Sequence, residues 1–269
     1  MNLHAPRGAR LAVPALLLMA TVPVAAAERP ACLEASGTIV VAAEAIDGDT
    51  VALADGRIVR LAGVEAPKRP LAVPDDRPWP AADAARAGLH DLVAGAPVTL
   101  LQSGSATDRH GRIPGRLLLA DGRWVEGELA AAGLVRARWL PGETSCFQAL
   151  LALERGAREA ARGLWASPAY AVLGADDPSL RSRNGLYELV EGRIVSVGHG
   201  SRMVFLDFGR NVRSDFTAMV PPVVAEQLAV AGIAVDALAG RRVRVRGVIE
   251  ESGGPAIRLN DIAEFEVID

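Results

Sequence analysis

Charged side chains gather around one short hairpin near the start of the chain. Within residues 46–68, two apolar stretches flank the dipeptide Asp55-Gly56, which is typical of a tight turn between two β-strands. Carboxylates are the ligands that hard cations prefer, and guanidinium groups match the oxygens of a phosphate. Three residues of these types and one amine mark the two strands and the segment after them: Asp49, Arg60, Glu65 and Lys68.

A second charged block, Asp108-Arg109-His110-Gly111-Arg112, follows further along the chain. It resembles the Asp-x-Tyr-Gly-Arg motif of the staphylococcal nuclease (thermonuclease) family. The first block is similar to that family's other signature, which has an Asp-Gly-Asp-Thr turn, a strand with an Arg, and an Asp-Thr-Pro-Glu segment. The resemblance implies that residues 28–166 form an SNase-like domain, a five-stranded OB barrel with added helices.

The resemblance also implies a role for each matching residue. Members of the family bind calcium through two carboxylates and one backbone carbonyl, which here are Asp49, Glu65 and the carbonyl of Ala66. Arg60 and Arg112 take the positions of the two arginines that bind and stabilise the phosphate. Ordinary ion pairing of these arginines with Asp49 and Glu65 is the alternative.

Several positions depart from the family pattern. Lys68 stands where the family has its general-base glutamate, so a proton acceptor is replaced by an ammonium group. This change removes two units of negative charge, and unit charges about 6 Å apart interact by roughly 3 kcal/mol at an effective dielectric constant near 20. Calcium binding is therefore expected to be weakened. His110 and Trp139 replace two tyrosines that contact the nucleotide base.

Three functions fit these residues. The first is weak binding of nucleic-acid phosphates, DNA or RNA, with hydrolysis weakened or lost and Lys68 standing in for the cation. The second is a calcium-dependent endonuclease in which another group, such as His110, serves as the base. The third is a non-enzymatic scaffold of the cell envelope.

The elements that must position these residues predict an α+β fold that is mainly β. In the first domain we expect strands at 37–46, in the central hairpin, at 98–101, 116–120 and 134–139, and helices at 81–94, 124–132 and 145–162. Residues 167–186 are rich in Pro, Asp, Ser and Gly and are predicted to be a linker. Residues 187–269 repeat the order of three strands, a helix and two strands, which predicts a second OB-like barrel.

A stripe of arginines marks the second predicted barrel. Alternation along 241–246 places Arg242, Arg244 and Arg246 on one face of a strand. Such a stripe suits binding along the phosphate backbone of a single-stranded nucleic acid. Alternatively, Glu264 and Glu266 on a nearby strand could pair with it as a ladder of ion pairs.

The N-terminus predicts export. Two arginines precede an apolar run that ends in three alanines, which is typical of a signal peptide spanning 1–27. Its removal takes the formal net charge from −3 to −5, so a polyanion must be met by a local basic patch. In a periplasmic or secreted protein the two cysteines, Cys32 and Cys146, are expected to form a disulfide.

Overall fold

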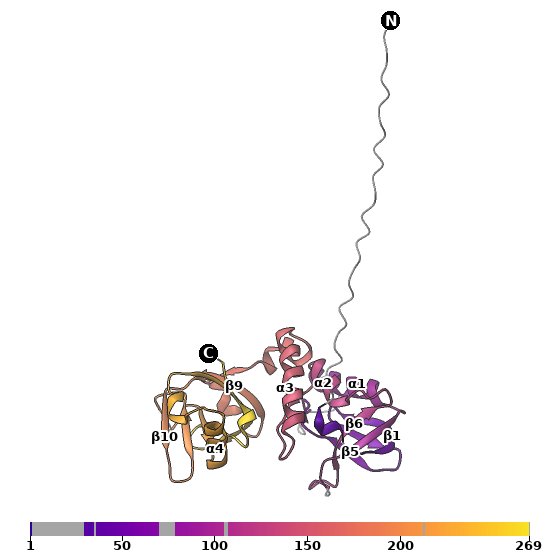
Figure 1. The fold of residues 1–269 in the computed structure, drawn as a ribbon, viewed down its shortest axis with the longest axis horizontal. Coiled ribbons are helices and arrows are strands. Elements are labelled where there is room, and N and C mark those ends of the chain that lie inside the picture. Colours follow the sequence, from indigo (N-terminus) through magenta and orange to yellow (C-terminus); the bar gives the residue numbers. More distant parts are fainter. Residues whose placement is uncertain (2–29, 35, 70–78, 105–106, 212, 269) are drawn as a thin grey trace.

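The computed structural model describes residues 1, 30–34, 36–69, 79–104, 107–211 and 213–268. Two β-rich units lie on opposite sides of the long helix α3 (Figure 1). Apart from Met1, the predicted signal peptide lies outside the described residues. No helix in the described part of the chain is long and apolar enough to cross a membrane.

The first unit is a closed barrel with the strand order β1-β2-β3-β6-β5. The Asp55-Gly56 turn joins β2 to β3, and Gly56 has a φ of 87°, which explains why glycine occupies the turn. Strands β3 and β6 are parallel and the other neighbouring pairs are antiparallel. The strands are β1 (Thr38–Asp47), β2 (Thr50–Leu53), β3 (Ile58–Leu61), β5 (Pro97–Gln102) and β6 (Ile113–Leu119).

Three helices cover this barrel, as the sequence predicted. They are α1 (Pro80–Val93), α2 (Val125–Ala131) and α3 (Thr144–Glu159). In α1, Ala85, Leu89 and Val93 are buried in the barrel core, because a spacing of four residues keeps them on one face. The predicted strand at 134–139 is reduced to β7 (Arg136–Ala137), which pairs with β4 (Val64–Glu65) outside the barrel.

A disulfide joins Cys32 to Cys146, with Cα atoms 5.7 Å apart, as the sequence predicted. Cys32 lies in a short 3-10 helix, η1 (Ala31–Leu33), and Cys146 is buried in the first turns of α3. The bond therefore ties the start of the described chain to the helix that separates the two units.

The second unit has the strand order β10-β11-β12-β14-β13-β9-β8, with β15 also paired to β13. Only Ile194 and Val195 separate β9 from β10, and their amides continue the pairing to Arg241 and Asp207 respectively. Strands β9 and β10 therefore act as one interrupted first strand, which pairs with β13 through β9 and with β11 through β10. This is the OB order that the sequence predicted. The elements are β9 (Tyr187–Arg193), β10 (Ser196–His199), β11 (Val204–Asp207), β12 (Thr217–Val220), α4 (Pro222–Val230), η5 (Val235–Leu238), β13 (Arg242–Glu251), β14 (Pro255–Arg258), η6 (Ile262–Glu264) and β15 (Phe265–Val267).

The predicted linker segment has structure of its own. It follows η2 (Gly163–Ala166) and contains η3 (Pro168–Tyr170), β8 (Leu173–Gly174) and η4 (Pro178–Ser182). Strand β8 pairs with β9, and Leu173 and Leu180 are buried in the second core. This segment connects the units and also packs against the second one.

Buried polar contacts join the two units. Arg246 on β13 donates to Glu154 on α3 at 3.0 Å, and Arg136 on β7 donates to Glu188 on β9 at 2.9 Å. The Tyr187 hydroxyl donates to the carbonyl of Ala137 at 3.0 Å. These contacts fix the start of β9 against the β4–β7 pair, beside the charged residues of the first barrel.

Candidate phosphate-binding site

Asp49 is the buried centre of the charged cluster. It lies in the turn between β1 and β2 and has no exposed surface. One carboxylate oxygen accepts from the Ala66 amide at 2.7 Å and lies 3.1 Å from a guanidinium nitrogen of Arg60. The other accepts from the Thr50 hydroxyl at 3.2 Å and from Lys68. Burial raises the pKa of Asp49, while the charges of Arg60 and Lys68 oppose that rise.

Arg60 is held by both backbone and side-chain acceptors. One of its terminal nitrogens donates to the carbonyls of Leu61 and Val64, at 2.9 and 3.1 Å. The other donates to Glu65 at 3.0 Å, and Arg138 also pairs with that carboxylate. Arg60 therefore forms the ion pairs with Asp49 and Glu65 that the sequence left open as an alternative to a free phosphate ligand.

Lys68 lies between two carboxylates of the hairpin. Its ammonium nitrogen is 2.7 Å from Asp47 and also bonds Asp49. Burial by itself would raise the pKa of Asp47, but the hydrogen bond and charge of Lys68 outweigh it and lower that pKa to about 2. The ammonium group thus lies between Asp47 and Asp49. Glu65 is not its partner, because Glu65 is turned toward Arg60 and Arg138.

The cluster does not fit a calcium ion. Its three carboxylates, Asp47, Asp49 and Glu65, are all engaged by basic groups. Those groups number three as well, so the cluster has no excess negative charge for a dication. In the described part of the chain, no three His, Cys, Asp or Glu residues are grouped so that they could hold a metal ion. Ala66 contacts Asp49 through its N–H.

Arg112 immediately precedes β6, the strand that pairs with β3. Arg60 on β3 is in register with Pro114 on β6, two residues after Arg112. The Arg112 guanidinium pairs with Asp108 at 2.8 Å. Burial would raise the pKa of Asp108, but its hydrogen bonds with Arg112 lower it to about 2. The nearby His110 is exposed, and its ring accepts from Arg109 at 3.0 Å.

Trp139 packs against the core of the first barrel. Its indole N–H is buried and has no hydrogen-bond partner among the described residues. The ring is therefore partly used in packing.

The arginine stripe of β13 is mainly an ion-pair network. Arg244 pairs with Glu191 at 2.8 Å and with Glu266 at 3.2 Å, and Arg242 lies 3.6 Å from Glu191. Arg246 is 2% exposed because α3 covers it. The prediction that this stripe tracks a phosphate backbone is therefore wrong for Arg246, and Glu266 rather than Glu264 supplies the pairing.

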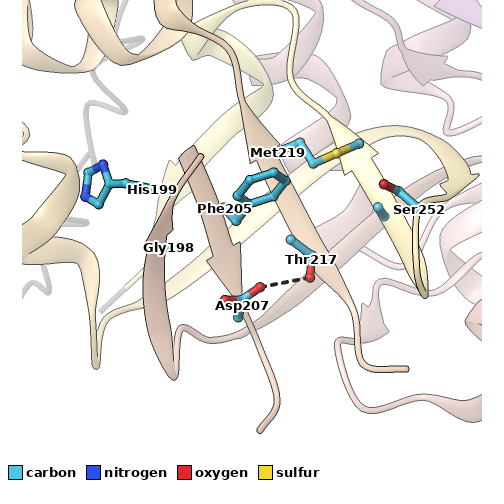
Figure 2. Close-up of a pocket in the computed structure, with 8 residues that line it drawn as sticks. Gly198, His199, Phe205, Asp207, Thr217, Met219 and Ser252 are labelled. Atoms are coloured by element: carbon cyan, nitrogen blue, oxygen red, sulfur yellow. Dashed lines mark hydrogen bonds between the residues drawn. The ribbon is translucent and has the colours of Figure 1, made fainter. Parts of the chain in front are cut away.

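A separate pocket lies on the sheet of the second barrel (Figure 2). Its volume is about 310 Å³, and Phe205 and Met219 line it together with Asp207 and Thr217, which are joined by a hydrogen bond. Of the described residues that line it, none is Lys or Arg. This pocket therefore lacks the positive charge that a nucleic-acid backbone needs.

A second cleft, which sequence reasoning missed, adjoins the charged cluster. It lies between the two units and includes Glu65 and Lys68 together with Tyr170 and Tyr187. Only Tyr187 stands out in the sequence, as an aromatic residue near a barrel start. Tyr170 belongs to the segment predicted to be a linker.

Comparisons with known proteins bear on the first unit. Residues 58–167 match the family model described as Staphylococcal nuclease homologue. No curated protein matches the chain. The matched region carries Arg60, Glu65, Lys68 and Arg112 and most of the closed five-stranded barrel. The first unit of this chain therefore matches the staphylococcal nuclease homologues over these residues and has an SNase-like OB fold.

Proposed function

We propose that this protein binds the phosphates of nucleic acids in its SNase-type cleft, with hydrolysis of the phosphodiester bond weakened or lost. The match of the first unit to the nuclease family supports a nuclease-like or nucleic-acid-binding function. The observation that carries the finer proposal is the position of Lys68, whose ammonium bonds both Asp47 and Asp49.

The ammonium group opposes both parts of the family's chemistry. While charged it cannot take a proton from an attacking water, and its neutralisation of Asp47 and Asp49 removes the negative potential that attracts calcium. The same neutralisation favours an anion, because Arg60 and Arg112 then face no excess of carboxylate charge. Lys68 takes the place of the cation in this proposal.

Export is the other part of the proposal. The apolar run after Arg7 and Arg10 and the Cys32–Cys146 bond both support a periplasmic or secreted protein. Detection of the chain shortened by residues 1–27 in a periplasmic or culture fraction, by mass spectrometry, would support it. A full-length chain confined to the cytoplasm would contradict it.

The function is tested by rebuilding the family's segment. Lys68→Glu, combined with Glu65→Asp and Ala66→Thr, should increase calcium affinity in titration calorimetry, because the cluster changes from neutral to net negative. Calcium-dependent cleavage in a zymogram should then appear or increase by about 100-fold, the effect typical of one positioned general base.

Arg112→Ala in the rebuilt background is the control, because activity that survives it comes from a contaminant. If the unmodified protein already cleaves with calcium at a rate that Lys68→Glu fails to improve, the proposal is wrong and another group, such as His110, is the base. If the unmodified protein binds no nucleic acid at low salt, a scaffold role replaces the proposed one.

A further inference from the structure

A cleft between the two units continues from the charged cluster. Its volume is about 460 Å³, within the range of pockets that hold small ligands. The cleft is lined by Glu65 at the end of β4, by Ala66 and Lys68 after it, and by the start of β9 with Tyr187. Of the residues proposed to bind phosphate, Lys68 therefore also lines this cleft, whereas Arg60 and Arg112 lie outside its lining.

Three aromatic side chains line the cleft from three different segments. Trp79 precedes α1, Tyr170 ends η3 and Tyr187 begins β9, and each is partly exposed. Aromatic rings around a cavity provide stacking surfaces for an unpaired nucleic-acid base.

The floor of the cleft is a buried basic group. Arg136, 5% exposed, donates to the carbonyls of Tyr187 and Tyr170 at 2.6 and 2.9 Å and to Glu188 at 2.9 Å. Its Nε is buried without a hydrogen-bond partner among the described residues. Arg136 therefore links the backbones of Tyr170 and Tyr187 and is a charged residue of the cleft lining.

The charge of the floor is positive. Glu188 is shared between Arg136 and Arg183, whose guanidinium donates to its other oxygen at 2.7 Å. Two guanidiniums therefore face one carboxylate, while the charges of Lys68 and Glu65 in the cleft lining offset each other. A ligand with an aromatic ring, hydrogen-bond acceptors and a negative charge suits these surroundings.

We propose that this cleft is a nucleotide subsite, which takes the base and sugar of a single-stranded nucleic acid whose phosphate is bound beside Lys68 and Arg112. The inference rests on the proposed function and extends it, because the second barrel and the connecting segment contribute half of the subsite. Double-stranded nucleic acid is not taken, since its bases are stacked and paired.

Fluorescence anisotropy of the full chain tests the subsite. The two probes are a short labelled oligothymidylate and a labelled sugar–phosphate strand of the same length without bases, both with EDTA to prevent cleavage. Trp79→Ala and Tyr170→Ala should each weaken binding of the oligothymidylate by about 5- to 150-fold, the effect of losing one base–aromatic stack. Binding of the abasic strand should stay unchanged.

Phe205→Ala is the matched control, because Phe205 is an aromatic residue that lines the other pocket, and it should leave both probes unaffected. Trp79→Phe guards against loss of folding, because it keeps a ring. The oligothymidylate should quench the tryptophan fluorescence of the parent, and this variant should still bind but lose most of the quenching.

The outcomes separate the two proposals. If Arg112→Ala weakens both probes while the Trp79 and Tyr170 variants bind as the parent does, the subsite is wrong and phosphate binding stands. If the parent binds neither probe at low salt, both proposals fail.

Discussion

Glu126, in the first turn of α2, is a carboxyl group with no exposed surface. One of its oxygens accepts from the Leu117 amide at 3.4 Å. Burial raises its pKa from 4.5 to about 8, against the opposing attraction of Arg116. The folded protein therefore holds a proton here at a pH where the unfolded chain has lost it.

This difference predicts how stability depends on pH. The contribution of Glu126 is fully present below about pH 4.5 and is lost as the pH rises toward about 8. The loss across that window is on the order of 4 kcal/mol. Glu126→Gln mimics the protonated acid, so its free energy of unfolding in urea should fall less between pH 5 and pH 8 than that of the parent.

Glu128→Gln is the control for this prediction, because Glu128 lies on the same helix, is partly exposed and pairs with Arg123. It should keep the pH dependence of the parent. If the free energy of unfolding falls by the same amount between pH 5 and pH 8 in the Glu126 and Glu128 variants, the buried carboxyl does not cause the pH dependence.

At the scale of elements, α3 connects the disulfide to the core of the first unit. It carries Cys146 of the disulfide and also Phe147 and Leu150 of the first core. The bond closes a loop with a sequence separation of 114 residues. In the chain-entropy model, closing a loop of this length reduces the freedom of the unfolded chain by an amount worth about 4.7 kcal/mol.

Reduction of the disulfide should therefore destabilise the first unit. Urea unfolding of the mature protein should give a free energy of unfolding lower by about 2–5 kcal/mol with a reductant than without it. The double variant Cys32→Ala, Cys146→Ala should match the reduced parent and should not respond to the reductant. A reductant effect that persists in the double variant would contradict this origin.

At the scale of the whole molecule, Arg246 and Glu154 join the second unit to the first. Both side chains are buried, and the Arg246 guanidinium also lies 5.9 Å from the Phe147 ring. Burial would lower the pKa of Arg246, but the charge of Glu154 outweighs burial and raises it. The Arg246 guanidinium therefore stays charged inside the interface.

Removal of one partner should weaken the contact between the two units and lower the stability of the protein. Arg246→Ala leaves Glu154 buried without its main counter-charge, which should cost about 3–5 kcal/mol and lower the melting temperature in calorimetry. The double variant Arg246→Met, Glu154→Leu should recover most of the loss, because it leaves no buried charge.

Arg158→Ala provides the comparison, since Arg158 also pairs with Glu154 but is partly exposed. Arg158→Ala should lower the free energy of unfolding by less than Arg246→Ala does. If the two single variants melt at the same temperature, burial of Arg246 does not decide the strength of the interface.

Much of the fold could be predicted from local features of the sequence. The Asp55-Gly56 turn with apolar flanks predicts the hairpin, and the spacing of Ala85, Leu89 and Val93 predicts α1, because the period of each pattern matches one backbone geometry. The cysteine pair is predicted by the export signal, since two cysteines allow one bond. Both OB orders follow from the succession of such elements.

The partners of the charged side chains were decided by the tertiary structure. Alternation placed Arg242, Arg244 and Arg246 on one face, but only the packing of α3 against that face buries Arg246. The β4–β7 pair aligns Glu65 with Arg136 in register, and the Glu65 carboxylate pairs with Arg60 and Arg138, which leaves Lys68 to Asp47 and Asp49. Sequence periodicity specifies which face a side chain occupies, whereas its partner depends on which distant segment covers that face.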